Sequence, residues 1–356
     1  MQAKQRLEGY DLARALAIFG MVIVNYRIVM GGVSPEPGFW NWLTGLLEGR
    51  AAALFVVLAG ASLSLMAAGA ISQNNRQKLR QVRFRLIKRA LFLLVVGLAY
   101  TPIWPADILH FYAFYLLLGV FFLTARSPTI LLSAAALVLL FPILLVTLDY
   151  SAEWQWETLH YEGFWTPTGL FKHLFFNGFH PVIPWAAFLL IGLTFARTDM
   201  GQKKSRRLLG LLAGLSAVLV EISATLCEKL ALEVMSAEDA AALFATGPIP
   251  PNPFYMIAAG SAAIAVIAVC FEIAEKFNRW LRPLFQTGRH ALTHYVAHVV
   301  LGMALLEELQ LMDDRSPLEA LMAATLFFTS AVLFSWLWSK KFRQGPLEWV
   351  MRKLCG

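Results

Sequence analysis

Long apolar runs separated by short polar segments dominate the sequence. A run of about 17–25 mostly apolar residues is long enough to cross a bilayer as a helix. Ten runs of roughly this kind occur, and the third, closed by Pro105, is the shortest. They cover residues 10–32, 50–71, 90–104, 107–124, 128–148, 181–196, 208–226, 254–274, 291–306 and 318–338. The pattern predicts an all-α, polytopic integral membrane protein with about ten transmembrane helices, in which the third and fourth runs can instead form a hairpin around Trp104 and Pro105.

Composition supports a membrane protein and argues against a water-soluble one. Of the 356 residues, 58% are hydrophobic and only 15% are charged, whereas a soluble domain is about 25% charged. One soluble core of this size cannot hide so many apolar side chains. The expected main partner of this surface is therefore the lipid bilayer.

The basic residues are concentrated in alternate predicted loops. The formal net charge is +7, and 25 of the 30 Lys and Arg fall on one side of the predicted membrane. These lie in the N-terminal segment and at 76–89, 126, 197–207, 276–289 and 340–353. An excess of Lys and Arg in cytoplasmic loops is typical of membrane proteins. We therefore expect both termini in the cytoplasm, a multi-pass location in the membrane, and no nucleic-acid partner.

Ionisable residues at membrane depth are costly and often functional. Asp11 and Arg14 are three residues apart, so they can pair on one helix face, either as a structural salt bridge or near a ligand. Asn25, Arg27 and Arg50 lie near the opposite, outer boundary. The two arginines either extend to the headgroups or line a polar cavity for an anionic or carbonyl-bearing substrate.

Histidines supply the candidate chemistry. Asp107 and His110 have the spacing that places both on one helix face, where a carboxylate can orient an imidazole as a general base or simply form a structural pair. His290, His294 and His298 recur every four residues and share one stripe, which favours a pocket lining or a proton path over a haem site. We expect no metal site, because neither this stripe nor the three cysteines has a metal-ligand spacing. His180 follows an aromatic loop, residues 150–180, that either stacks on a sugar or rests on the headgroups.

Several segments resemble one family of membrane proteins. The opening RLEGYDLARALAIFGMVIVN resembles that of the YeiB-like proteins and of heparan-α-glucosaminide N-acetyltransferases. Later segments agree in the same order, namely LFVVLAGASLSLM, DILHFYAFYLLLG, HPVIPWAAFLLIGLTFAR, TGRHALTHYVAH and QGPLEWVMR. Two departures are that Ala15 replaces a family glycine and that residues 28–49 contain no histidine, where the acetyltransferases carry an essential one.

The resemblance implies a single transmembrane acyltransferase domain over residues 1–356. Such proteins pass an acyl group from cytoplasmic acyl-CoA to an acceptor, often a sugar, on the far side. The family's Asn carries over to Asn25 and its C-terminal histidine to His298. We expect acyl-CoA or acetyl-CoA as co-substrate, no other cofactor, and an envelope carbohydrate or lipid as acceptor. The resemblance also implies a multi-pass location in the bacterial inner membrane, and a homodimer is compatible with it.

The predicted roles follow from this reaction. His110 is the expected base, oriented by Asp107, and Asn25 the expected oxyanion donor. Arg27, Arg50 and His180 are expected to bind the acceptor, at the depth of the catalytic residues. The acyl donor is assigned to Arg14, Arg289, His294 and His298. The alternatives are a transporter or lipid-flipping protein with a polar translocation path, and a haem protein using the His290–His298 stripe.

Overall fold

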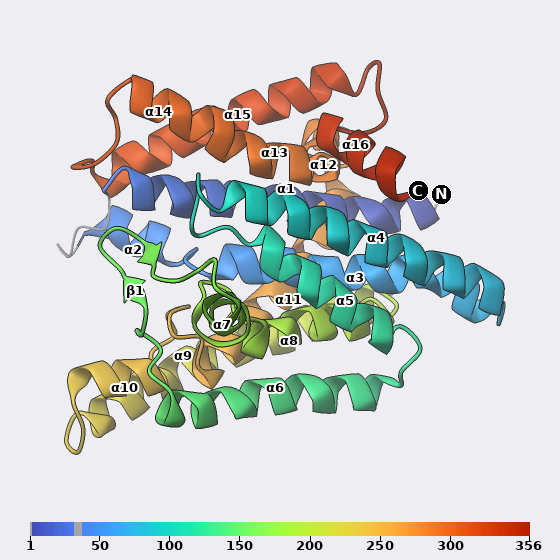
Figure 1. Ribbon diagram of the computed structural model, residues 1–356. Helices are drawn as coiled ribbons and strands as arrows, with labels where there is room; N and C mark the ends of the chain where they lie inside the picture. The colour runs from blue at the N-terminus through green and yellow to red at the C-terminus, as the bar shows by residue number, and fades with distance from the viewer. Residues whose placement is uncertain (1, 32–37) are drawn as a thin grey trace. The chain divides into compact units, whose positions relative to one another are not determined.

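The computed structural model describes residues 2–31 and 38–356, with side chains from Glu8 onward. Its described residues form helices and a single short β-hairpin (Figure 1). Contacts divide the chain into two compact units. Unit 1 comprises Met1–Phe55, Met200–Gly210 and Ala263–Leu354, and unit 2 comprises Val56–Asp199, Leu211–Ala262 and Cys355–Gly356. The expectation of a single functional domain stays a prediction.

Unit 1 is built around the first helix, against which α12 and α15 pack most extensively (Figure 1). Its helices are α1 (Gln2–Val29), α2 (Phe39–Gly45), α12 (Arg282–Arg289), α13 (Ala291–Ala297), the π-helix η2 (His298–Met303), α14 (Ala304–Glu308), α15 (Pro317–Trp338) and most of α16 (Pro346–Cys355). Three further helices have residues in both units, namely α3 (Arg50–Ser72), α9 (Lys203–Ala231) and α11 (Pro253–Lys276). Of the predicted loop at 28–49, residues 32–37 lie outside the described part of the chain.

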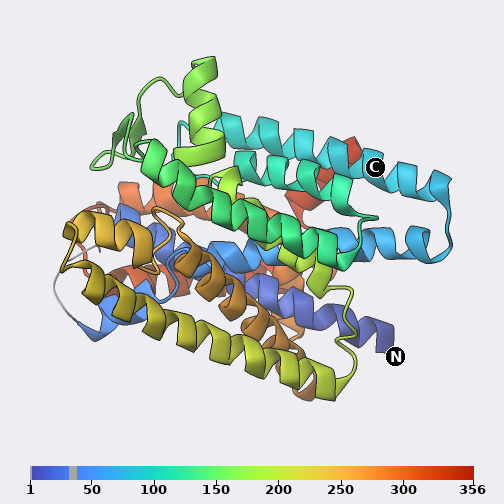
Figure 2. The same ribbon diagram turned by 90° about the horizontal axis from the view of Figure 1, so that it is seen from below.

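Unit 2 contains two closely packed helix pairs, α4 with α5 and α6 with α8 (Figure 2). Its elements are α4 (Arg76–Tyr100), α5 (Leu109–Phe122), α6 (Ser127–Thr147), β1 (Trp154–Gln155), β2 (His160–Tyr161), α7 (Pro167–Lys172), the π-helix η1 (His173–Asn177), α8 (Val182–Phe195) and α10 (Ala237–Phe244). The aromatic loop therefore has its own structure, an antiparallel β1–β2 hairpin followed by α7 and η1.

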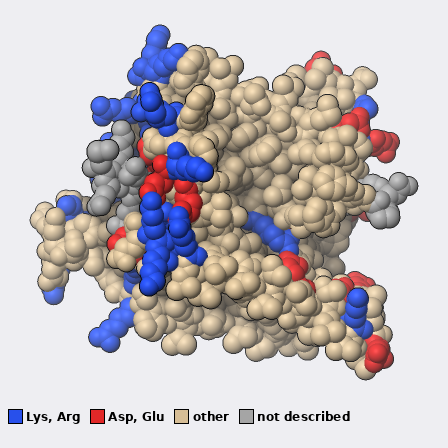
Figure 3. Space-filling view, turned by 180° about the vertical axis from the view of Figure 1, so that it is seen from behind, with Lys and Arg blue, Asp and Glu red and all other residues tan. Residues whose placement is uncertain are grey.

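Among the described residues, six helices are long and apolar enough to cross a membrane. The number is seven if the pair formed by Pro167–Asn177 and Val182–Phe195, bent by 51°, is one span. The six are Glu8–Val29, Phe39–Ser72, Ser127–Thr147, Lys203–Ala231, Pro253–Lys276 and Pro317–Trp338. In α6 and α9, only 17% and 11% of the most apolar window is buried. Broad uncharged areas separate the groups of charged side chains (Figure 3). Such exposed apolar helices need lipid around them, so the protein is a multi-pass membrane protein.

The expected third and fourth spans take another form, and the ninth contains a π-helical turn. The third run joins the basic segment before it in one helix, α4, which packs against the short α5. The structure thus favours the hairpin of the third and fourth runs. The ninth run is one uninterrupted helical stretch in which α13, the π-helical turn η2 and α14 follow one another. The total of ten spans and the location of the termini stay predictions.

Candidate active site

In unit 2, Asp107 and His110 form a fully buried pair at the start of α5. The Asp107 carboxylate oxygen Oδ2 lies 3.0 Å from His110 Nδ1 and accepts the backbone N–H groups of Leu109 and His110 at 2.9 and 3.2 Å. Both side chains have no exposed surface. The predicted contact is confirmed. Because a carboxylate accepts the Nδ1 proton, the unshared electron pair resides on Nε2.

The close approach of α4 fixes this pair. A Cβ atom on Gly97 would lie 2.4 Å from the backbone nitrogen of His110 and 2.9 Å from Asp107 Oδ2. Only glycine fits at this position, where α4 crosses the first turn of α5. His110 Nε2 itself is buried and has no hydrogen-bond partner among the described residues. Asp107 thus orients the ring through Nδ1, while Nε2 is left to accept a proton, as a general base requires.

Two more histidines surround His110. The His173 ring is stacked on it with centroids 5.6 Å apart, and the Phe111 ring lies 5.2 Å from His173 and 5.9 Å from His180. Tyr115 donates a hydrogen bond to the His180 carbonyl oxygen. Within the described structure, Nδ1 of His173 and Nδ1 of His180 are buried without partners. The expected acceptor residue His180 and the expected base His110 therefore belong to one buried cluster.

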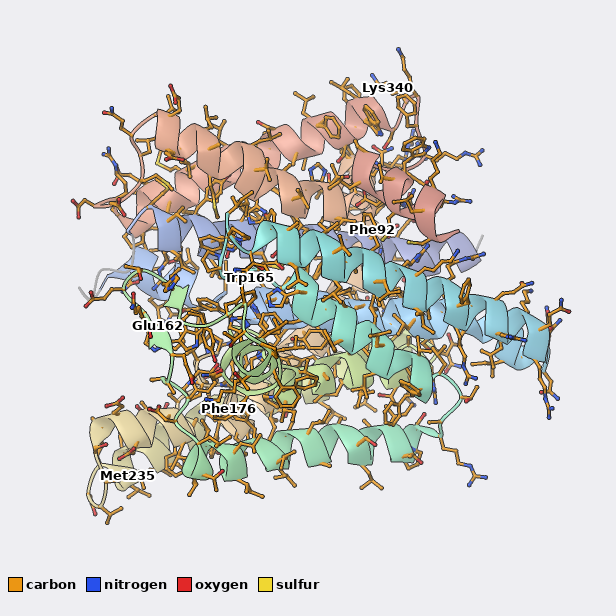
Figure 4. All side chains as sticks on the ribbon, in the orientation of Figure 1. Phe92, Glu162, Trp165, Phe176, Met235 and Lys340 are labelled. Atoms are coloured by element: carbon orange, nitrogen blue, oxygen red, sulfur yellow. The ribbon has the colours of Figure 1, made fainter. Side chains whose placement is uncertain are left out.

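The β1–β2 hairpin covers this cluster with aromatic rings. Trp154, Tyr161 and Phe164 place their rings 5.5, 4.8 and 4.9 Å from the His173 ring. Trp154 Nε1 and the Tyr161 hydroxyl donate to the carbonyl and side-chain oxygens of Asn177 at 2.6 and 3.0 Å. Side chains crowd around α7, between the labelled Trp165 and Phe176 (Figure 4). Burial raises the pKa of Tyr161 to about 12.

In unit 1, the conspicuous polar pair joins α1 to η2. Asn25 Nδ2 lies 2.8 Å from Nε2 of His298, and the Tyr26 hydroxyl donates to the His298 carbonyl oxygen at 3.3 Å. His298 is completely buried, and the part of the chain described here supplies no partner for its Nδ1. His298 begins a π-helical turn, a feature that occurs frequently at functional sites.

At the other end of α1, one carboxylate holds two arginines. Asp11 Oδ1 accepts from Arg14 Nη1 at 2.6 Å, and Asp11 Oδ2 accepts from Arg289 Nε at 2.7 Å. The predicted Asp11–Arg14 pair is confirmed. Two guanidinium groups on one carboxylate give this group of three side chains a net positive charge, which suits a phosphate.

Residues 6–224 match the family described as heparan-α-glucosaminide N-acetyltransferase, catalytic, and residues 194–356 match the family described as protein of unknown function (DUF418). The chain belongs to the YeiB-like and heparan-α-glucosaminide N-acetyltransferase-like family. A similar relative is the uncharacterized protein YxaH of Bacillus subtilis (strain 168), 23% identical over 98% of this chain and 94% of YxaH. Another is the uncharacterized protein YeiB of Escherichia coli (strain K12), 37% identical over 67 residues, which are 19% of this chain and 17% of YeiB. An uncharacterized 39.9 kDa protein in the amylase 3′ region of Bacillus acidopullulyticus is 32% identical over 31% of this chain and 29% of that protein.

In unit 1, residues from separate family motifs of this chain contact one another. The two residues matched to the family motifs, Asn25 and His298, are the pair described above. Glu348, of the Gly-Pro-Leu-Glu-Trp motif, accepts the backbone N–H groups of Leu292 and Thr293 at 2.7 and 3.1 Å. It thereby caps α13. Burial raises the pKa of Glu348.

The remaining predicted residues are placed as follows. His290 and His294 both contact the hydroxyl of the buried Ser335, at 3.2 and 2.6 Å. Arg27 lies 3.8 Å from Glu48 in unit 1, and Arg50 begins α3. The expected convergence of Asn25, Arg27 and Arg50 with Asp107 and His110 stays a prediction, because the two sets belong to different units. No group of three or more His, Cys, Asp or Glu side chains in residues 2–31 and 38–356 is placed to hold a metal ion.

Sequence reasoning missed three functional candidates. His173 lies within the aromatic loop of residues 150–180, Ser335 within the apolar run 318–338, and Glu348 within the Gly-Pro-Leu-Glu-Trp motif. For Ser335, a polar residue inside an apolar run is a usable signal, since a serine at membrane depth needs a partner. His173 carried no comparable signal, because its stacking on His110 depends on the π-helical turn η1.

The α1–α12 contact yields a stability prediction. A Cβ atom on Gly288 would lie 1.8 Å from the carbonyl oxygen of Asp11. We expect Gly288→Ala to destabilise the protein by about 1–3 kcal/mol or more, because the two helices must separate. Thermal unfolding in detergent measures this. The control is Gly214→Ala in α9, where a Cβ would meet nothing within 4 Å. Equal stability of the two variants would contradict the close approach.

Proposed function

We propose that this protein is a transmembrane acyltransferase that passes an acyl group from cytoplasmic acyl-CoA to an envelope carbohydrate or lipid. Membership of an N-acetyltransferase-like family supports the reaction class. The single observation that carries the proposal is the buried Asp107–His110 pair, whose Nε2 has no partner among the described residues.

In the proposed reaction, His110 Nε2 removes the proton from an acceptor hydroxyl or amine as it attacks the thioester carbonyl carbon. The new acyl–acceptor bond forms, the carbon–sulfur bond breaks, and CoA leaves as a thiolate that takes up a proton. Asp107 stabilises the imidazolium during the attack. Asn25 is assigned as donor to the developing oxyanion, and Arg27, Arg50 and His180 as acceptor-binding groups.

The donor is assigned to unit 1. Arg14 and Arg289 would bind CoA phosphates, with His294 and His298 along the path of the pantetheine arm. Asp11 and Asn25 are 14 residues apart on α1, which is about 21 Å along the helix axis. The extended arm of CoA suits such a separation between the phosphate site and the Asn25–His298 pair.

Loss of the Arg289 side-chain charge should weaken donor binding. We expect Arg289→Gln to reduce acetyl-CoA affinity by about 1–3 kcal/mol, the cost of a lost charge-assisted contact. Calorimetry in lipid nanodiscs measures it. Arg282→Gln, an exposed position in the same helix, is the matched control. Equal affinities of the two variants would remove Arg289 from the donor site.

The proposed topology has ten spans, both termini in the cytoplasm, and an inner-membrane location. Single cysteines introduced in residues 76–89 are expected to react only from the cytoplasmic side, and those in residues 150–165 only from outside. The reason is the 25-to-5 division of Lys and Arg. Reaction of both sets from one side would refute the arrangement.

A transporter remains the second candidate, because α7–η1 and α8 form one bent helix pair. Discontinuous helices are typical of transporter binding sites. Labelling cells with radioactive acetate, with and without the gene, separates the two. An acyltransferase changes the label in an envelope fraction, whereas a transporter without transferase chemistry does not.

A further inference from the structure

Ser335 is a buried polar side chain in the last part of α15, in unit 1. It has no exposed surface, and His290 and His294 are only 1% and 2% exposed. Ser335 Oγ lies 2.6 Å from His294 Nε2 and 3.2 Å from His290 Nδ1. A helical serine can donate to a carbonyl oxygen of its own helix, as Ser330 does to Leu326 at 2.9 Å. Ser335 instead contacts two histidine rings outside α15.

The single proton of the hydroxyl decides how these three side chains share hydrogen bonds. A serine hydroxyl can donate to only one of the two rings, so the other ring must donate to it. N–H groups approach an oxygen acceptor to about 2.7 Å, whereas hydroxyl donors make bonds as short as about 2.5 Å. The 2.6 Å contact therefore has Ser335 as donor and His294 Nε2 as acceptor. The 3.2 Å contact suits His290 Nδ1–H donating to Ser335 Oγ.

This arrangement fixes the position of the proton on His294. A neutral imidazole carries a proton on one nitrogen, and an imidazolium carries protons on both. Because His294 Nε2 accepts a hydrogen bond, the ring is neutral and its proton is on Nδ1. Nδ1 can then only donate, so it suits a carbonyl oxygen of a ligand and not an N–H group.

We propose that Ser335 is a positioning residue that holds His294 as the Nδ1–H tautomer, so that His294 donates to a carbonyl oxygen of the acyl donor. This role rests on the proposed function, which places His294 along the path of the pantetheine arm. The thioester and the amides of that arm supply the carbonyl oxygens. Without the hydroxyl, His294 is free to adopt the other tautomer, in which Nδ1 carries a lone pair and repels a carbonyl oxygen.

Nitrogen-15 NMR of the full-length protein in lipid nanodiscs tests the tautomer, because it separates protonated from unprotonated ring nitrogens. All seven histidines are labelled, and His294→Gln identifies the signals of His294 by their loss. In the unchanged, ligand-free protein, Nδ1 of His294 should be protonated and Nε2 unprotonated. A proton on His294 Nε2 would overturn the proposal, and this measurement needs no variant at Ser335.

Ser335→Ala should turn the His294 signals into those of a mixture of tautomers, whereas Ser335→Thr, which keeps the hydroxyl, should preserve the Nδ1–H form. The matched control is Ser330→Ala, which removes a hydroxyl from an exposed position of the same helix and should leave the signals of His294 unchanged. An unaltered tautomer in Ser335→Ala would show that the hydroxyl does not set it.

Acetyl-CoA tests the second half of the proposal. Its addition should shift the His294 Nδ1 signal, and Ser335→Ala should raise its Kd about fivefold, the usual effect of one lost hydrogen bond. A shift that persists with S-ethyl-CoA, which lacks the thioester carbonyl, would assign the contact to a pantetheine amide. Binding of acetyl-CoA without any shift at Nδ1 would rule out the carbonyl contact. If acetyl-CoA does not bind at all, the proposed function fails with that contact, while the ligand-free tautomer still decides what Ser335 does.

Discussion

His110→Ala should lower the rate of acyl transfer by roughly two to four orders of magnitude, the usual contribution of a general base. Asp107→Asn should also slow the reaction, because it removes the negative charge that orients the ring and stabilises the imidazolium. Neither change should alter acetyl-CoA affinity. Transfer from radiolabelled acetyl-CoA, normalised to folded protein, measures both.

The control for this pair is His160→Ala, since His160 is an exposed histidine of β2 in the same unit. It should leave the rate unchanged. If the Asp107–His110 pair is only structural, both variants will unfold at lower temperature and each folded molecule will keep its activity. That result would exclude His110 as the base.

Asn25→Ala should lower the maximal rate by about 100- to 1,000-fold, as loss of one oxyanion donor does. The amide's hydrogen bond to His298 Nε2 occupies one of its two N–H groups and fixes the direction of the other. Single-turnover rates at saturating acetyl-CoA separate this effect from weaker donor binding. An unchanged rate would remove Asn25 from the chemical step.

His298→Ala distinguishes the two histidines. As a residue of the donor path that also orients the Asn25 amide, His298 should affect the KM for acetyl-CoA and lower the maximal rate by no more than Asn25→Ala does. If His298→Ala abolishes transfer at saturating donor while His110→Ala does not, then His298 is the base. His298 is the alternative candidate because it matches the C-terminal histidine of the family, and as a base it would use Nε2, the nitrogen that accepts from Asn25.

Local spacing allowed several features to be predicted. The Asp107–His110 and Asp11–Arg14 contacts follow from helix geometry, because residues three apart lie on one face whatever surrounds the helix. The apolar helices at 10–32, 128–148 and 318–338 follow from run length in the same way. The membrane environment follows from composition, since lipid is the solvent that so much apolar surface requires.

Contacts between distant residues were decided by tertiary structure. Asn25 and His298 are 273 positions apart, and Asp11 and Arg289 are 278 apart. Helix periodicity gives the face of each residue and carries no information about which helix that face meets. The α1–α12 contact depends on the absence of a side chain at Gly288, which has no hydrophobic pattern.

The ninth run, which is helical throughout but includes a π-helical turn, shows the same limit in the backbone. An apolar sequence from 291 to 306 predicts one helix, because hydropathy does not register hydrogen-bond spacing. In the structure, Gly302 lies so close to Tyr26 that a Cβ atom would be 1.9 Å from the phenol oxygen. The π-helical turn η2 occurs at this contact. The sequence by itself therefore determined which segments are apolar, where positive charge lies and which neighbours share a helix face. The tertiary structure decided which helix faces meet, because that depends on how the helices pack.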